Sequence, residues 1–383
     1  MATIEQQPAA QVHTPSSLRV RVSGFVITVQ AILFLVHWFV YETWTSLRPE
    51  TDSLALRTVA LLLSVSFISA SLLAYRHWNV WVRAFYRVAA VWLGLLNFFF
   101  LAACVSWAIY LPARALGLHI ARSSIADVTF GLAALAAFCG LLNARWLRVK
   151  RITLQLPNLP QSWRGRAAAV VSDVHLGHVN GASFLRRIVI QLRQLRPDVV
   201  FLPGDLFDGS QADLDALAAP WKQLSPPFGT YFVTGNHEEF SDRTKYLRAV
   251  SHSGIRVLNN EKITLDHLQI LGVHDRESSH PELFRSILDS TAIDRSRASI
   301  LLAHVPRHLQ IPEDAGISLQ LSGHTHGGQF FPFTWFTHRI FRNFTHGLNR
   351  FANLLVYTSY GAGTWGPPLR LGTHPEIVLI EFK

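Results

Sequence analysis

Four long apolar runs fill the first part of the chain, at residues 23–41, 58–75, 88–111 and 124–142. Each approaches or exceeds the ~18 residues that a helix needs to cross a hydrocarbon core. Buried helices of a large soluble protein are the alternative, but four such runs with short polar links are typical of membrane spans. Trp and Tyr cluster near the run ends, as at membrane interfaces: Trp38, Trp44, Tyr75, Trp78, Trp81, Tyr86 and Tyr110. We expect an all-α four-helix transmembrane domain over residues 19–148, after a disordered tail at residues 1–18.

From residue 149 the pattern changes to short apolar runs that mostly end in Gly, Asp, Asn or His. The predicted strands are residues 152–156, 167–171, 199–202, 231–233, 268–271, 299–302, 319–321, 354–357 and 377–380. Helix-like stretches lie between several of them, at residues 183–195, 211–224 and 242–253. Strands alternating with helices predict an α/β domain with largely buried sheets over residues 149–383.

The charge pattern suggests an orientation for the spans. The heavier set of basic residues lies before the first run, in the second link and after the fourth run: Arg19, Arg21, Arg76, Arg83, Arg87, Arg145, Arg148, Lys150 and Arg151. Basic flanks stay in the cytoplasm, so we expect a multi-pass membrane protein with the domain of residues 149–383 in the cytoplasm. The net charge of +10 fits such flanks and anionic lipid. Without a nucleic-acid motif, we expect no nucleic-acid partner.

Polar side chains follow five of the predicted strands, where α/β folds place their sites. The blocks are Asp173-Val174-His175, Gly204-Asp205-Leu206-Phe207-Asp208, Gly235-Asn236-His237-Glu238, His304 and Gly323-His324-Thr325-His326. Each block alone is also compatible with a turn, a helix cap or a core histidine, but their joint occurrence favours a site. Oxygen and nitrogen donors without a thiol suit Mn, Fe, Zn or Ni. About seven donors are too many for one metal and suit two metals that share a carboxylate.

The order of these blocks resembles the calcineurin-like metallophosphoesterase superfamily over residues 151–383. The segment Gly361-Ala362-Gly363-Thr364-Trp365-Gly366-Pro367-Pro368-Leu369-Arg370, followed by Pro375-Glu376-Ile377, is similar to a bacterial membrane-associated branch. That branch includes single-chain phosphodiesterases and a UDP-2,3-diacylglucosamine pyrophosphatase. The resemblance implies a four-layer α/β/β/α sandwich with a dinuclear site at one edge, in a protein of the bacterial inner membrane.

The resemblance also implies roles for individual residues. One divalent metal ion would be bound by Asp173, His175, Asp205 and His326, and a second by Asp205, Asn236, His304 and His324, with Asp205 as the bridge. Two such ions activate a bridging water and hold the phosphate oxygens for in-line attack. His237 would stabilise the transition state and protonate the leaving oxygen, and Asp208 would orient His237.

Several positions depart from the family pattern or leave alternatives open. Tyr360 stands where relatives carry an arginine, so a phosphate-contacting arginine is missing or is supplied by Arg370. His178 either touches substrate or is an exposed loop histidine, and His274 either lines the cleft or does not. The aromatic segment at residues 330–342 is either a flap over the core or an interfacial element that dips into the bilayer and admits a lipid tail.

We therefore expect a membrane-anchored dinuclear phosphoesterase that hydrolyses phosphodiester or pyrophosphate bonds, on a lipid- or nucleotide-linked substrate. The alternative is a membrane sensor or scaffold that uses the same fold as a binding module, which the intact ligand set disfavours. A phosphoprotein phosphatase is a third option, without support from a recognisable peptide groove.

Overall fold

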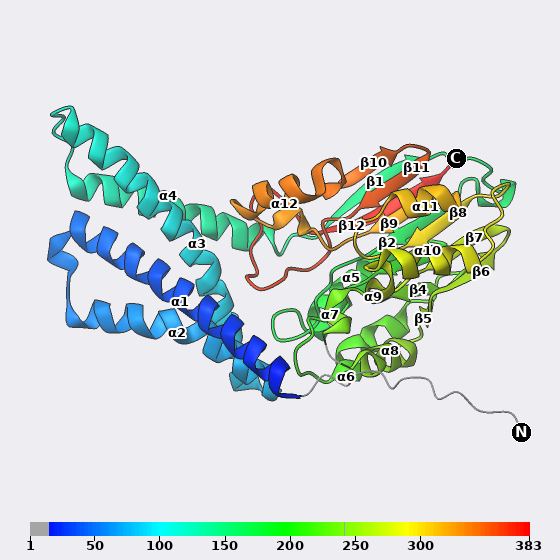
Figure 1. The fold of residues 1–383 in the computed structure, drawn as a ribbon, viewed down its shortest axis with the longest axis horizontal. Helices are drawn as coiled ribbons and strands as arrows, with labels where there is room; N and C mark the ends of the chain where they lie inside the picture. Colours follow the sequence, from blue (N-terminus) through cyan, green and yellow to red (C-terminus); the bar gives the residue numbers. More distant parts are fainter. Residues whose placement is uncertain (1–14, 241) are drawn as a thin grey trace, which may run out of the picture. The chain divides into compact units, whose positions relative to one another are not determined.

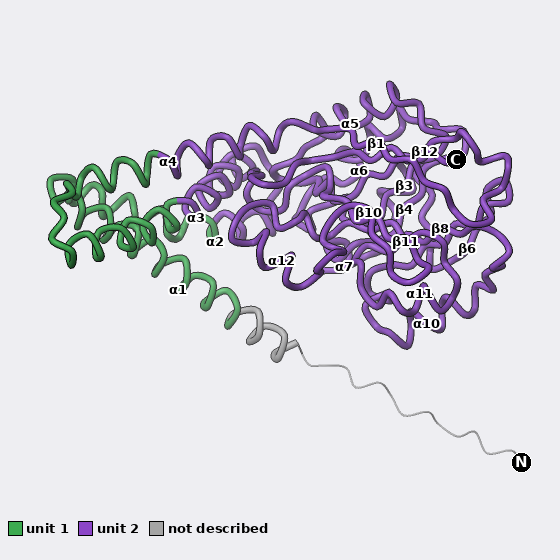
Figure 2. Tube along the Cα trace, turned by 90° about the horizontal axis from the view of Figure 1, so that it is seen from above, with its two compact units in different colours: residues 1–69, 99–131 green, residues 70–98, 132–383 purple. Residues whose placement is uncertain are grey.

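The computed structural model describes residues 15–240 and 242–383. The chain forms two compact units, one of residues 1–69 and 99–131 and one of residues 70–98 and 132–383 (Figure 2). Helices α2 (Leu54–Arg76), α3 (Val80–Ala115) and α4 (Arg122–Asn143) each contribute residues to both units. The expected tail at residues 1–18 lies outside the described residues as far as residue 14, and helix α1 begins at Pro15.

Four long helices precede the sheets, as the hydrophobic pattern predicts. They are α1 (Pro15–Leu47), α2 (Leu54–Arg76), α3 (Val80–Ala115) and α4 (Arg122–Asn143). All four are long and apolar enough to cross a membrane. The helical part of the expected fold class is therefore confirmed.

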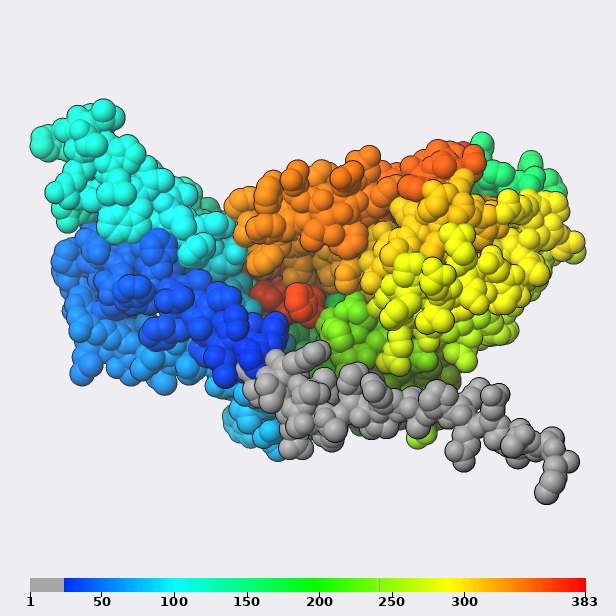
Figure 3. Space-filling model, viewed as in Figure 1, coloured from blue at the N-terminus to red at the C-terminus, as the bar shows by residue number. Residues whose placement is uncertain are grey.

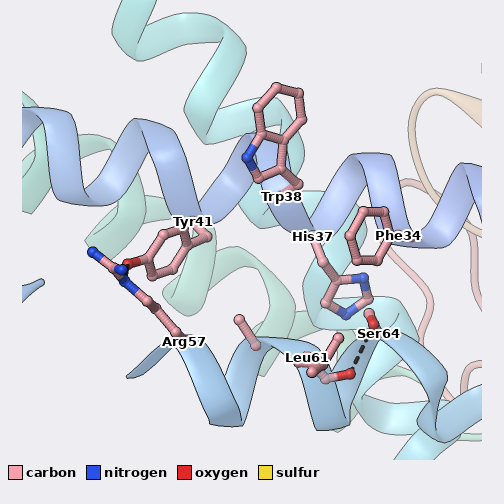
Figure 4. A pocket seen from close by; sticks show the side chains of 8 residues that line it. Phe34, His37, Trp38, Tyr41, Arg57, Leu61 and Ser64 are labelled. Atoms are coloured by element: carbon pink, nitrogen blue, oxygen red, sulfur yellow. Dashed lines mark hydrogen bonds between the residues drawn. The ribbon is translucent and has the colours of Figure 1, made fainter. Parts of the chain in front are cut away.

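Pairs of polar side chains join the helices of the first unit. In lipid, apolar side chains alone do little to determine which helix faces pack together. The Thr43 hydroxyl accepts the indole N–H of Trp107 at 2.9 Å, and the hydroxyls of Ser106 and Thr129 lie 2.7 Å apart. A pocket of about 220 Å³ lies between α1 and α2 (Figure 4), lined by Phe34, His37, Trp38, Tyr41, Arg57, Ala60, Leu61 and Ser64. Its largely apolar lining sets it apart from the carboxylate and imidazole cluster described below.

Two six-stranded sheets form the centre of the second unit (Figure 1). The first has the order β1 (Arg148–Leu154), β12 (Glu376–Phe382), β2 (Ala167–Val170), β3 (Val199–Pro203), β4 (Thr230–Val233) and β5 (Arg256–Val257). The second has the order β10 (Gly347–Phe351), β11 (Leu354–Thr358), β9 (Leu319–Ser322), β8 (Ser299–Leu302), β7 (Leu268–Gly272) and β6 (Glu261–Leu265). Strands β2, β3, β4 and β5 run parallel, and so do β7, β8, β9 and β11.

Three apolar clusters define the layers. One lies between the first sheet and helices α5 (Ala182–Leu195), α6 (Leu214–Ala218) and α8 (Arg243–His252). A second lies between the two sheets. The third joins the second sheet to α10 (Pro281–Ser290) and α11 (Gln310–Ala315). This arrangement is the expected four-layer α/β/β/α sandwich, so the fold class is confirmed.

Three strands escaped the sequence analysis, namely β5, β6 and β10. Strands β6 and β10 are edge strands without a fully buried residue, and β5 has only two residues. Such segments lack the apolar run that marks a buried strand. The remaining helices are α7 (Asn236–Glu239), α9 (Asp275–Ser278) and α12 (Phe333–Phe341), with short 3-10 turns at Pro49–Thr51, Gln161–Trp163, Ala219–Gln223, His326–Gly328 and Arg342–Thr345.

Candidate metal centre

The seven expected ligands lie together at the carboxyl ends of strands from both sheets. The loops after β2, β3 and β4 carry Asp173, His175, Asp205 and Asn236, and the loops after β8 and β9 carry His304, His324 and His326. Five of them are buried, with 0–7% of each residue exposed, and Asn236 and His324 are half-buried. The site is therefore a largely desolvated cluster of carboxylates and imidazoles.

Backbone strain is concentrated at these ligands. The residues with left-handed φ values of 48–71° include Asp173, His175, Asp205, His324 and His326. For non-glycine residues this region costs of order 1 kcal/mol each. Such strain persists only where the surrounding structure fixes it, which is common where side chains must converge on a ligand.

One group of donors forms around His175. Its Nε2 lies 2.9 Å from Nε2 of His326, which in turn lies 3.5 Å from Oδ1 of Asp173. Asp173 also accepts the main-chain N–H of His324 at 2.9 Å. A β-carbon on Gly323 would stand 2.1 Å from Oδ2 of Asp173, so this close approach requires glycine.

A second group forms around Asp205. Its Oδ2 lies 3.1 Å from Nε2 of His304 and 3.8 Å from Nε2 of His175. Asp205, His304 and His324 offer ligand atoms that all lie within 4.8 Å of one another. Nδ1 of His324 is also 2.9 Å from the side-chain oxygen of Asn236. Asp205 therefore faces both groups of donors with the same oxygen.

The chemistry of this cluster fits divalent cations. Nε2 of His304 is buried without a hydrogen-bond partner although it points at a carboxylate. Burial acts to lower the pKa of His304, but Asp205 and Asp173 outweigh it and raise the pKa to about 10. The carboxylates therefore stabilise a positive charge at this point, and the neighbouring nitrogen and oxygen donors suit a metal ion.

His237 lies beside the donors, and the main chain orients its ring. The ring packs edge-on against His175, with centroids 4.7 Å apart. Its Nδ1 lies 2.9 Å from the main-chain carbonyl of Asp208, to which Nδ1–H donates, so Nε2 is free to face the site. The sequence analysis expected this orienting contact from Asp208, and the structure gives it to the carbonyl rather than the carboxylate. The Asp208 carboxylate instead accepts the main-chain N–H groups of Ser210 and His178.

Glu238 has a structural role that the sequence analysis missed. Its carboxylate is fully buried and accepts three main-chain N–H groups, from Asp205 at 3.1 Å, Phe207 at 2.9 Å and Gly235 at 2.8 Å. Burial, followed by the charge of Asp205, raises the pKa of Glu238 to about 8. Glu238 thus holds the loop that presents the Asp205 carboxylate.

Arg370 is not available to contact a phosphate, which corrects one expectation from the sequence. Its guanidinium is fully buried and donates to the main-chain carbonyls of Tyr360, Gly363 and His326. Nη2 lies 3.0 Å from Nδ1 of His326. Burial, with His175 and Arg370, holds the pKa of His326 well below its ordinary value. Burial therefore keeps His326 neutral, the form that binds a metal, and the charges of His175 and Arg370 act in the same direction.

Two histidines whose roles the sequence left undecided, His178 and His274, are buried in structural contacts. His178 is neither exposed nor in the site, because its ring is buried against Trp78 and its Nε2 lies 3.1 Å from the carbonyl of Ala74. His274 is fully buried, and its Nδ1 accepts the N–H of Thr234 at 3.0 Å. Both contacts involve residues 40 or more positions away, which local sequence patterns cannot show.

Arg307 is a further cationic side chain beside the site that the sequence analysis overlooked. It lies three residues after His304 and is 32% exposed at its side chain. Its Nη2 donates to Asp275 at 3.1 Å, while its Nε has no hydrogen-bond partner. After burial and His304, Arg307 is among the causes that lower the pKa of His324 to about 3. Its charge therefore reaches the donor cluster.

Comparison with known proteins gives a consistent result. The sequence profile of the family described as "Calcineurin-like phosphoesterase" matches residues 168–328. The chain is 33% identical over 242 residues to an uncharacterized metallophosphoesterase of Campylobacter jejuni, covering 61% of this chain and 63% of the relative. It is 32% identical to a transmembrane protein with metallophosphoesterase domain of Danio rerio, covering 76% of this chain and 71% of the relative.

A metallophosphoesterase of Aquifex aeolicus, itself uncharacterized, is 32% identical over 250 residues, covering 63% of this chain and 94% of the relative. The matched segments thus range from just under two thirds to nearly all of these relatives. The profile match covers all seven expected ligands as well as His237. The chain therefore belongs to the calcineurin-like metallophosphoesterase family.

Proposed function

We propose that this protein is a membrane-anchored phosphoesterase that uses two divalent metal ions to hydrolyse phosphodiester or pyrophosphate bonds. The observation that supports it most is the position of Asp205, whose Oδ2 faces His175 on one side and His304 on the other. Its other oxygen, Oδ1, accepts the main-chain N–H of His237 at 3.0 Å. The carboxylate is thus held in place to be shared by two ions.

The bound ions would be Mn, Fe, Zn or Ni, and they would lower the pKa of a water between them and neutralise charge on the phosphate. Asp173, His175 and His326 would hold one ion, Asn236, His304 and His324 the other, and Asp205 would bridge. In its imidazolium form His237 would keep the Nδ1–H bond to the Asp208 carbonyl and give the proton on Nε2 to the leaving oxygen. The exposed rings of Phe240 and Trp365 flank His237, with centroids 4.7 and 6.0 Å away, and would exclude water from the leaving group.

Arg307 would take the phosphate-binding role that Arg370 does not have. The partial exposure of its side chain leaves part of the guanidinium open to a phosphate oxygen. In Arg307→Ala we expect KM for a diester to rise about tenfold, with kcat and metal content little changed. A fall in kcat at constant KM would contradict this role.

The test uses the full-length protein in detergent, stripped with a chelator and reloaded with Mn. We expect two metal ions per chain by elemental analysis and metal-dependent hydrolysis of bis(4-nitrophenyl) phosphate. Asp205→Asn should lose the bound metal and the hydrolysis. His237→Ala should keep both metal ions but turn over the ester at least 100-fold more slowly. Loss of an ion in His237→Ala would make His237 a ligand instead. Two ions bound without turnover of any ester would support the alternative, a membrane sensor or scaffold.

The physiological substrate in this proposal is a lipid- or nucleotide-linked phosphate ester. Turnover of phospholipids, UDP-diacylglucosamine and nucleotide diesters by the same preparation would distinguish the two. We further propose a bacterial inner-membrane location with the catalytic domain in the cytoplasm, on the distribution of basic residues. A C-terminal reporter that is active only outside the inner membrane would contradict this topology.

A further inference from the structure

Helix α12 (Phe333–Phe341) presents an apolar face that no described residue covers. It contains no buried residue. Phe333, Phe336 and Ile340, spaced as one helix face, are 49, 50 and 72% exposed. Trp335 beside them is 54% exposed. In Figure 3 the orange segment that includes α12 forms part of the outer surface. The outer face of the helix is therefore not packed against the core, as it would be in a flap that buries its aromatic side chains.

The opposite side of the same segment borders the candidate metal centre. The ring of Phe341, the last residue of α12, lies edge-on to His324 with centroids 5.9 Å apart. The turn that precedes α12 contains His326. The exposed face and the donor cluster are thus separated by the thickness of one helix.

The segment just before α12 contacts α3, and the length of α3 indicates how deep in the membrane this contact lies. The main-chain carbonyl of Phe331 accepts the side-chain N–H of Asn97 at 2.9 Å, and Phe330 packs on Phe98 with centroids 5.8 Å apart. Seventeen residues, about 26 Å of helix, separate Phe98 from the end of α3 at Ala115. A hydrocarbon core is about 30 Å thick, so with Ala115 at one boundary the other boundary lies about one helical turn before Phe98.

The length of helix α4 independently indicates that this region lies at the membrane–water boundary. Its 22 residues span about 33 Å, so its last turn, which begins at Gly140, belongs at the membrane–water boundary. Leu369 packs closely on both helices, because a β-carbon on Gly140 would lie 2.7 Å from its side chain and a β-carbon on Gly94 of α3 would lie 3.3 Å from it. The loop after Leu369 is bonded to the turn before α12, because Leu371 N–H donates to the Gln329 carbonyl at 2.9 Å.

We propose that α12 lies in the interface of the bilayer that holds α1–α4, with Phe333, Phe336 and Ile340 directed toward the acyl chains. The exposed Arg339 and Arg342 would meet anionic headgroups, and Trp335 suits the headgroup level. The substrate class follows from this placement together with the proposed function. An amphiphilic phosphate ester would reach the donor cluster with its acyl part still in the membrane.

Lipid contact can be measured without activity. In a full-length background with Cys104→Ala and Cys139→Ala, an Ile340→Cys variant is labelled with an environment-sensitive fluorophore and reconstituted in nanodiscs of phosphatidylcholine and phosphatidylglycerol. We expect a blue-shifted emission and quenching by lipids spin-labelled near the headgroup. Leu283→Cys is the matched control, because Leu283 is a 50% exposed apolar residue of helix α10. Equal quenching at the two positions would overturn the proposal. Quenching that is absent at Ile340→Cys, with crosslinking between two copies through that position, would identify a second copy of the chain as the occupant and also overturn it.

Turnover provides the second readout. In Phe333→Ser/Phe336→Ser we expect about a tenfold lower ratio of activity on a phospholipid in mixed micelles to activity on bis(4-nitrophenyl) phosphate. Leu283→Ser should leave this ratio unchanged. Equal loss on both substrates would refute the role of α12 in substrate access. If the wild-type protein hydrolyses neither ester in the presence of metal, the proposed function fails, and the quenching result still decides whether α12 contacts lipid.

Discussion

Replacement of Arg370 tests whether this residue organises the metal centre or binds a phosphate. The guanidinium has no exposed surface and donates to the carbonyls of Tyr360, Gly363 and His326 at 2.6–3.3 Å. In Arg370→Leu these buried carbonyls lose their donors, and each unsatisfied buried group costs about 1–3 kcal/mol. Some of them will find water, so we expect the free energy of unfolding to fall by about 3–5 kcal/mol.

The same change should weaken metal binding. Arg370 donates to the main-chain carbonyl of His326 and so holds the turn that carries this donor. Loss of such an outer-shell contact typically costs 10–100-fold in metal affinity. The assay is a Mn titration of the chelator-stripped full-length protein, with kcat and KM for bis(4-nitrophenyl) phosphate at saturating metal. We expect weaker metal binding and an unchanged KM.

Arg370→Lys separates this role from phosphate binding. Lysine keeps the charge and three donors but not the planar fork, so stability and metal affinity should fall by less than in Arg370→Leu. A raised KM in Arg370→Lys, with metal affinity and unfolding free energy like those of the wild type, would refute the structural role. It would instead support the phosphate contact that the sequence suggested.

Three further substitutions test other contacts within the second unit. Glu238→Gln replaces an acceptor of three N–H groups and should lower the unfolding free energy by about 1–3 kcal/mol, measured by denaturant titration. Gly140→Val places side-chain atoms where a β-carbon already lies 2.7 Å from Leu369 and should lower metal affinity, whereas Gly131→Val on the same helix meets open space and should not. Burial lowers the pKa of His274 from 6.5 to about 4, so between these pH values the unfolded chain binds a proton that the folded chain does not. The contribution of His274 to the free energy of unfolding is therefore complete above pH 6.5 and falls by about 3 kcal/mol toward pH 4. His274→Gln should remove that part of the pH dependence of unfolding, and an unchanged pH profile would contradict it.

The strand-end pattern was sufficient to predict which donors would meet. Parallel strands end at one edge of a sheet, so Asp173, Asp205 and Asn236 converge by topology alone, and His304 and His324 do so from the second sheet. Apolar periodicity likewise marks the buried strands and the long helices. These features depend on chain segments that are short and local.

The contacts that support the donors were not predictable in this way. Asp208 orients His237 through a carbonyl, which every residue has, so no residue type reveals it. Two of the three acceptor contacts of Glu238 depend on a loop 31–33 positions away. The burial of His178 depends on Ala74, more than 100 positions earlier. Each requires a tertiary arrangement that the residue type alone does not specify.

The helices that precede the sheets also support the donor cluster, beyond anchoring the chain. The side-chain amide of Asn143, at the end of α4, donates to the carbonyls of Arg370 and Thr373 at 2.9 and 2.8 Å. The Arg370 N–H donates to the Gly140 carbonyl at 3.0 Å. Since Arg370 in turn contacts His326, the last turn of α4 supports this member of the donor cluster through one intervening residue. A fragment that starts after α4 would lose these contacts and expose Leu369, so the chemistry of this site has to be measured on the full chain in detergent or lipid.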